Sequence, residues 1–217
     1  MPASIDGHAV RTQRTRSRIL EASLALFNEH GEAGVTTGMI AEALGISPGN
    51  LYYHFRNKDQ IVRELFAAFE RRMEVPTQAG GRGIEALEDL WLYLHLMMEA
   101  VWEYRFLYRE LGPMLRRDRR AREHFNRIAD RKVEAVEALC ADLVEARAMR
   151  ASPAEIATLA RNVLVVATYW LEFGTLRGGE PDLARGAHQV MSLVAPYLAP
   201  AARRHLDALA RGYLESL

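Results

Sequence analysis

The sequence predicts an all-helical protein with a small N-terminal domain and a larger C-terminal one. Apolar residues recur with a period of ~3.6 along most of the chain, and alternating runs rich in Val, Ile and Thr are absent. Cap and stop signals divide this pattern into separate helices. Pro76 and a cluster of glycines interrupt it within Glu74–Gly83, where we place the boundary between the domains.

The composition is that of a soluble globular protein, with 49% apolar and 26% charged residues. The formal net charge of zero argues against nucleic acid, since strong binders are usually basic. The distribution argues otherwise, because four arginines and no acid lie between Arg11 and Arg18. The single cysteine, Cys140, excludes an internal disulfide and suits a reducing cytoplasm. No apolar stretch approaches the ~18 residues of a membrane span, and no signal peptide precedes the domain, so we expect a cytoplasmic protein without a membrane partner.

The N-terminal half of the pattern indicates four helices. Residues 1–13 show no periodicity and are expected to form a flexible arm. The helix-turn-helix domain covers 14–57, and a connecting helix covers 58–75. Within the domain we expect helices over 16–30, from the N-cap at Thr36 or Thr37 to Leu44, and over 48–54.

The C-terminal domain is predicted to cover 84–217. Its clearest signal is Ser152-Pro153-Ala154-Glu155, a capping box with proline at the first helical position. We expect helices over 84–102, 104–111, 119–147, 153–173 and 183–198, and a short last helix. Gly112-Pro113 should close the second of these, and Gly174 the fourth.

The run Thr37–Phe55 has the features of two short helices that cross at a tight turn. Ala41 is small enough for a close approach, and Gly45 can adopt the left-handed conformation that ends the first helix. Ser47 can cap the second helix, whose Leu51 and Phe55 should point inward together. Asn50, Tyr52, Tyr53 and His54 are then left outside the core.

Exposed aromatics on so short a helix suggest a macromolecular partner, and the major groove of DNA is a good candidate. Tyr and His can donate to phosphates, Asn50 can reach a base edge, and Lys58 can add a phosphate contact. The alternative is an ordinary helix corner with a solvated polar face.

Over Arg14–Phe66 the sequence resembles the TetR family, most of all in Leu51-Tyr52-Tyr53-His54-Phe55-Arg56-Asn57-Lys58-Asp59. The resemblance implies a three-helix DNA-binding domain, a fourth connecting helix and a C-terminal ligand domain that dimerises. It implies that Tyr53, His54 and Lys58 hold phosphates and that the start of the recognition helix reads bases. Gly38 departs from the family, which often has a longer polar residue there. The expected DNA contacts are Arg14, Thr36, Thr37, Ser47, Pro48, Gly49, Asn50, Tyr52, Tyr53, His54 and Lys58.

The apolar surfaces of 153–173 and 183–198 are broad enough to pair with a second copy as a four-helix bundle. The family resemblance points to the same two helices. The alternative is that both are core helices of a monomer. The expected dimer contacts are Leu159, Val163, Val166, Trp170, Val190, Met191 and Val194.

Rings and methionines crowd 84–111 and could line an adaptable apolar pocket or belong to plain core. Trp91-Leu92-Tyr93-Leu94-His95-Leu96 and Tyr104-Arg105-Phe106-Leu107 look like the PhaD-type regulators of polyhydroxyalkanoate synthesis. That resemblance implies an apolar effector such as an acyl-CoA or a fatty acid. The expected pocket residues are Trp91, Leu94, His95, Met98, Trp102, Phe106, Tyr169 and Trp170.

Other functions find little support in the sequence. The arginine run 116–122 could bind a phosphate-bearing ligand, but a solvated helix start explains it as well. His95 could be a metal ligand or a buried core histidine. No metal-ligand spacing, phosphate loop or nucleophile motif indicates an enzyme, and we expect no cofactor and no metal. A ligand-binding protein that has lost DNA binding is disfavoured by the intact run Tyr52–Lys58. We expect a ligand-responsive dimeric regulator, a repressor, on a pseudo-palindromic operator.

Overall fold

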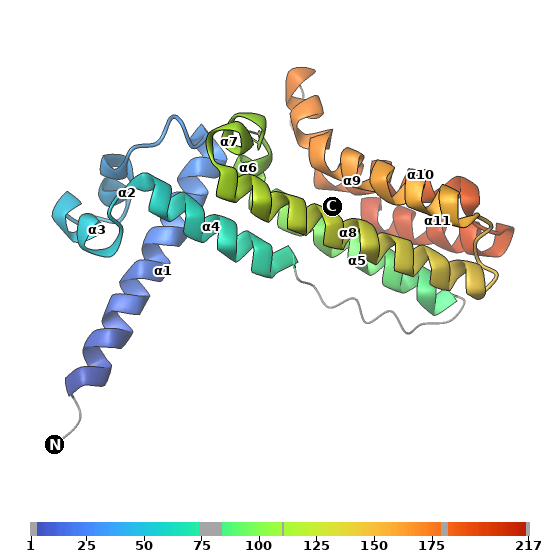
Figure 1. The fold of residues 1–217 in the computed structure, drawn as a ribbon, viewed down its shortest axis with the longest axis horizontal. Coiled ribbons are helices and arrows are strands. Elements are labelled where there is room, and N and C mark those ends of the chain that lie inside the picture. The colour runs from blue at the N-terminus through green and yellow to red at the C-terminus, as the bar shows by residue number, and fades with distance from the viewer. Residues whose placement is uncertain (1–3, 74–83, 110, 179–181, 216–217) are drawn as a thin grey trace. The chain divides into compact units, whose positions relative to one another are not determined.

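The computed structural model describes residues 4–73, 84–109, 111–178 and 182–215, and over these it is helical, with no named strand (Figure 1). The predicted fold class is confirmed. The expected boundary at Glu74–Gly83 and part of the turn before Leu183 lie outside the described residues. The helices are α1 Ser4–His30, α2 Thr37–Ala43, α3 Pro48–His54, α4 Lys58–Met73, α5 Ile84–Glu103, α6 Arg105–Arg109, α7 Leu111–Arg117, α8 Arg119–Glu145, α9 Pro153–Leu176, α10 Leu183–Val194, the 3-10 turn η1 Ala195–Tyr197 and α11 Pro200–Glu215.

The chain folds into two compact units that are not contiguous in sequence. Residues 1–71 and 104–121 form the first unit, and 72–103 and 122–217 form the second. The chain therefore passes between the units three times. The sequence predicted that 104–121 would belong with the C-terminal domain, whereas in the structure these residues belong with the N-terminal helices.

The core of the first unit is built on one stripe of α1. Ile19, Ser23 and Phe27 recur at helical spacing and are buried. The hydroxyl of Ser23 donates to the carbonyl of Ile19 at 2.7 Å, so this polar group is satisfied inside the core. Ile40 of α2, Leu51 of α3 and the α4 side chains Ile61, Leu65 and Phe69 complete the core.

Helices α6 and α7 are fastened to the end of α1 and to α4. Phe106 packs on Phe27 with ring centroids 5.3 Å apart, and its backbone N–H donates to Oδ1 of Asn28 at 3.1 Å. Arg109 donates to the carbonyl of Asn28 at 3.0 Å. The ring of Phe69 lies 5.6 Å from that of Tyr104 and 5.8 Å from that of Tyr108. These contacts explain why 104–121 joins the first unit.

The second unit is a helical bundle in which α10 packs on α9 and α5, and α11 packs on α5. Gly186 of α10 permits the close approach, because a Cβ there would lie 2.7 Å from the ring of Trp170 and 2.8 Å from Cε of Met98. Helix α8 has a buried stripe that includes Ile128, Val136 and Leu143.

Lys132 lies on this apolar stripe of α8 and is buried with it. Burial lowers the pKa of its ammonium group to about 7. No role was predicted for this residue from the sequence.

Three local expectations were wrong. The arm expected over 1–13 is helical from Ser4. Gly112-Pro113 does not close a helix but lies in the first turn of α7, where proline costs no helical hydrogen bond. Gly174 does not end α9, which continues to Leu176 and stops before Gly178, a residue at φ 72°.

Helix α9 is also long and apolar enough, by length and composition, to cross a membrane, with a mean hydropathy of 1.2. This differs from the expectation that no stretch approaches a span. Such a signal is weak evidence, since core helices of soluble proteins pass the same test, and 44% of this window is buried.

Candidate DNA-binding site

The helix pair α2–α3 is built by local caps that the sequence predicts correctly. The hydroxyl of Thr36 accepts from the backbone N–H of Met39 at 3.2 Å, and that of Ser47 accepts from the N–H of Asn50 at 3.2 Å. Gly45 adopts φ 64° between the helices, and the N–H of Ile46 donates to the carbonyl of Ala41 at 3.0 Å. Thr36 rather than Thr37 is the N-cap of α2.

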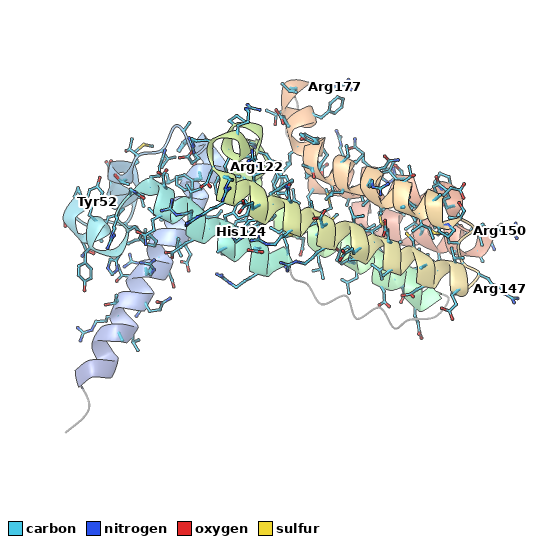
Figure 2. All side chains as sticks on the ribbon, in the orientation of Figure 1. Tyr52, Arg122, His124, Arg147, Arg150 and Arg177 are labelled. Carbon is cyan, nitrogen blue, oxygen red and sulfur yellow. The ribbon has the colours of Figure 1, made fainter. Side chains whose placement is uncertain are left out.

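Helix α3 is anchored through two side chains and presents the others to solvent. Leu51 and Phe55 are fully buried, as predicted. Tyr52 and Tyr53 are exposed at 50% and 70%, and Asn50 is exposed as well (Figure 2 labels Tyr52). Ser47, Pro48 and Gly49 are exposed at the start of the same helix. This face offers donors and acceptors to a groove without disturbing the core.

Four of the expected DNA contacts also interact in pairs within the protein. The hydroxyl groups of Thr37 and Tyr52 lie 3.0 Å apart and join α2 to α3. The rings of Tyr53 and His54 meet edge to face at 5.1 Å. Burial, and then the charge of Arg16, lower the pKa of His54 below its ordinary value of 6.5. Its imidazole is therefore neutral at neutral pH and can offer a phosphate a hydrogen bond but no charge.

The ammonium group of Lys58, which the sequence analysis expects to contact a phosphate, has three partners within the protein. Its Nζ lies 2.9 Å from Oε1 of Glu32 and donates to the carbonyls of Glu32 at 2.7 Å and Val35 at 3.0 Å. An ammonium group has three N–H donors, so these acceptors occupy all of them. Lys58 thus joins the start of α4 to the loop between α1 and α2.

Glu32 also faces Arg117 of α7, whose Nη2 lies 3.2 Å from Oε2. Burial alone would raise the pKa of this carboxyl group, but the hydrogen bonds from Lys58 and Arg117 outweigh it and lower the pKa below 4.5. We call Glu32, Lys58 and Arg117 the Glu32 cluster. Glu32 was not among the residues predicted from the sequence. Its partners Lys58 and Arg117 lie 26 and 85 residues away in the chain, and no local sequence signal indicates such a pairing.

Arg16 is a second cation that serves the fold. Its Nη1 donates to the carbonyl of His54 at 2.5 Å, its Nη2 pairs with Glu64, and its guanidinium lies 4.2 Å from the centre of the Phe55 ring. Its position three residues before Ile19, on the buried stripe of α1, was a signal that could have identified it. Arg14, by contrast, is exposed and remains available for DNA.

The ring-rich residues expected to bind an effector are divided between the two units. Leu94 and Met98 are buried, Trp91 stacks on His95 at 5.2 Å, and Trp102 stacks on Trp170 at 6.3 Å, all within the second unit. The remaining two are Phe106, which belongs to the first unit, and Tyr169, which belongs to the second. Phe106 is buried in the first unit against Phe27, and Tyr169 is 54% exposed. His95 lies 3.4 Å from Glu99. Among the described residues, no three His, Cys, Asp or Glu side chains gather as metal ligands.

The residues expected to form the dimer contact are core residues of one chain. Leu159, Val163, Trp170, Val190, Met191 and Val194 are each under 9% exposed, and Val166 is half-buried. The apolar side chains that α9 leaves exposed are instead Val165, Tyr169, Phe173 and Leu176, at 54–78% exposure. Their spacing places them on one stripe of the helix, and we call them the α9 stripe. The sequence could not separate the two faces, because both are apolar.

Comparisons with known proteins agree with this architecture. Residues 19–65 match the family described as bacterial regulatory proteins of the tetR family, and 64–206 match the TetR family of bacterial transcriptional repressors. The transcriptional regulator AcrR of Shigella flexneri is 29% identical over 98 residues, which cover 43% of this chain and 45% of that protein. The chain thus spans less than half the length of this curated relative.

Solved structures extend the likeness to nearly the whole chain. A TetR-family transcriptional regulator from Marinobacter aquaeolei is 36% identical, with a TM-score of 0.78 over 92% of this chain and 98% of that one. A regulator from Saccharomonospora viridis, solved in complex with choline, is 18% identical, with a TM-score of 0.65 over 84% of this chain and 96% of that one, and shows the fold alone. The chain therefore belongs to the TetR family of bacterial transcriptional regulators.

Proposed function

We propose that this protein is a ligand-responsive transcriptional regulator, a repressor, that acts in the cytoplasm on a pseudo-palindromic DNA operator. The observation that carries the proposal is the exposed face of α3. Asn50, Tyr52 and Tyr53 lie on this face, while Leu51 and Phe55 anchor the helix in the core. A helix of this kind fits the major groove, which alone distinguishes all four base pairs.

The contacts divide by chemistry. The Asn50 side chain can read a base edge, since an amide can pair in a bidentate manner with adenine. The hydroxyl of Tyr53, the neutral His54 and the exposed cation of Arg14 suit phosphates, which position the helix without reading sequence. Thr36, Thr37, Ser47, Pro48, Gly49 and Tyr52 lie around the starts of α2 and α3 and complete the proposed surface. Lys58 is left out of it, because its donors already serve the Glu32 cluster.

The proposed regulator is a symmetric dimer. Two copies of α3 would then lie about one DNA turn apart, ~34–36 Å, on the two halves of the operator. We assign the dimer contact to the α9 stripe rather than to the buried residues of α9 and α10. Four large apolar side chains exposed on one helix face are costly in water and are best explained by a second copy.

The proposed effector is a small apolar molecule, of the acyl-CoA or fatty-acid type. The ring-rich run Trp91–Leu96, which resembles the PhaD-type regulators, supports it, as does the ring pair Trp102–Trp170 in the second unit. The choline complex of the Saccharomonospora regulator supports small-molecule binding by the same fold. Such an effector would act by binding one arrangement of the protein better than another.

Selection from a random duplex pool tests the DNA-binding proposal. The unmodified chain should enrich one inverted-repeat sequence, and Asn50→Ala should relax preference at one position of each half-site, at a cost of about 1–3 kcal/mol. Tyr53→Phe should weaken binding to selected and scrambled duplexes alike. A chain that enriches no sequence would contradict the proposed function, and equal losses on both duplexes for Asn50→Ala would show that Asn50 is not the base reader.

A further inference from the structure

A depression of about 540 Å³ lies where α3 gives way to α4, and it is lined by Arg56, Asn57, Gln60 and Arg63. All four residues belong to the first unit and follow directly on the recognition helix. Two of the four are arginines. The surface beside α3 is therefore hollow and cationic at once.

The backbone around the depression is fixed by side-chain hydrogen bonds that leave the guanidinium groups out. Oδ1 of Asn57 accepts from the N–H of Gln60 at 2.9 Å, and Oε1 of Gln60 accepts from the N–H of Arg56 at 2.9 Å. These two bonds hold the turn in one shape. The amide oxygens of Asn57 and Gln60 thus accept hydrogen bonds within the turn, whereas the side chains of Arg56 and Arg63 are exposed.

Neither arginine is neutralised by the protein. Arg56 and Arg63 are exposed, and within the described part of the chain no ion pair involves either one. Asp59 lies one helical turn before Arg63, at a spacing that often gives an ion pair, yet none is formed. Two other cations of the first unit are engaged within the protein, since Arg16 binds Glu64 and Lys58 binds Glu32.

We propose that the depression of Arg56 and Arg63 binds a phosphodiester of the DNA backbone beside the bases that α3 reads. The inference rests on the proposed function and adds to it a site for the charge that Lys58 does not supply. A planar guanidinium offers paired N–H donors that match the oxygens of a phosphate, and two of them line this depression. Such a contact positions the protein on the duplex and carries no sequence information.

The test compares the full-length protein with Arg56→Gln, Arg63→Gln and the double variant, on the duplex selected by the unmodified chain and on a scrambled duplex. Arg150→Gln is the matched control, because it removes one exposed positive charge far along the sequence, in the second unit (Figure 2). Affinity is measured between ~50 mM and ~200 mM salt, where each lost phosphate contact lowers the log–log slope by ~0.9. Melting curves verify that every variant is folded.

The double variant should weaken binding to both duplexes, lower the slope by about one and leave the selected sequence unchanged, whereas Arg150→Gln should change the slope little. Arg63→Lys should bind more tightly than Arg63→Gln but less tightly than the unmodified chain, because lysine keeps the positive charge but lacks the paired N–H donors of a guanidinium. Neutralising single phosphates as methylphosphonates should reveal one position that weakens the unmodified protein but not the double variant.

The two proposals fail differently. If the unmodified chain binds its selected duplex and the double variant matches Arg150→Gln in affinity and slope, the phosphate site is wrong and the proposed function stands. The phosphate site is also wrong if every methylphosphonate affects the double variant and the unmodified protein alike, since the depression would then hold at most a free anion. If the unmodified chain selects no duplex, the proposed function itself is wrong.

Discussion

At the scale of single residues, cations in the first unit divide into those that hold the fold and those that face solvent. Arg16 and Lys58 reach backbone carbonyls and carboxylates, while Arg14, Arg56 and Arg63 are exposed. Charge-assisted hydrogen bonds to partly buried groups are strong, so the first set should contribute to stability. The second set is available for the proposed contacts with DNA.

Lys58→Met should reduce the free energy of unfolding by about 2 kcal/mol, because it leaves the Glu32 carboxylate and two carbonyls short of a donor. Urea unfolding measures the change, with Arg150→Met as the exposed control. Under conditions in which the variant is folded, Lys58→Met should change the affinity for DNA only slightly. Unchanged stability together with a salt slope lowered by about one would instead show that Lys58 serves the DNA, as the sequence first suggested.

The Glu32 cluster should also impose a pH dependence on stability. The folded-state pKa of Glu32 is lowered, so its contribution is complete above the ordinary value of 4.5 and is lost as the pH falls through the lower folded value. The unmodified protein should exceed Glu32→Gln in unfolding free energy at about pH 7, and the gap should narrow below about pH 4.5. A gap that stays constant with pH would mean that the charge of Glu32 is not what stabilises the loop.

At the scale of helices, Gly186 determines how closely α10 approaches α9. Gly186→Ala should cost about 1–2 kcal/mol, because the overpacking against Trp170 exceeds the gain in helix propensity. Thermal melting and the emission of the Trp102–Trp170 pair report the change. Gly112→Ala in α7 is the control, since its Cβ would meet only the flexible end of Arg116 at 3.4 Å. Equal effects of the two substitutions would contradict the close approach.

Lys132 places a titratable group on the buried face of α8. Because its folded-state pKa is about 7 and the ordinary value is 10.5, the unfolded chain binds more protons between these values, and stability should rise with pH over that range. Lys132→Met should therefore melt higher than the unmodified protein at about pH 6, by ~3 °C or more, and the difference should close toward pH ~10. A difference that does not change with pH would show that desolvation of the ammonium group is not the cause.

The sequence was sufficient for elements with local signals. Ser47 and Pro48 fix the start of α3, Ser152 and Glu155 form the predicted capping box, and Gly31 and Gly45 adopt positive φ where the helices end. Contacts across long separations were out of reach. The partners of Asn28 and Glu32 lie 78 and 85 residues away, and only the folded chain brings them together.

At the scale of the whole molecule, the proposed dimer depends on which face of α9 is exposed in a single chain. Val165→Glu with Tyr169→Glu should give a folded monomer, because both side chains are exposed in one chain. Val163→Glu should unfold the protein, since that side chain is buried. Light scattering and melting curves separate these results, with Ala141→Glu on the exposed side of α8 as the control. An unmodified chain that is monomeric at micromolar concentration would overturn the dimer.

The discontinuous first unit constrains how this protein could be recombined with its relatives. A chimera joined at residue 72 would take the DNA-binding helices from one parent and α6–α7 from the other. Phe27, Asn28 and Phe69 would then meet foreign partners in place of Phe106, Arg109 and Tyr108. A functional hybrid must therefore take 104–121 from the same parent as 1–71. The module that can be exchanged is contiguous in space but not in sequence, and a gene fusion at a single point would divide it.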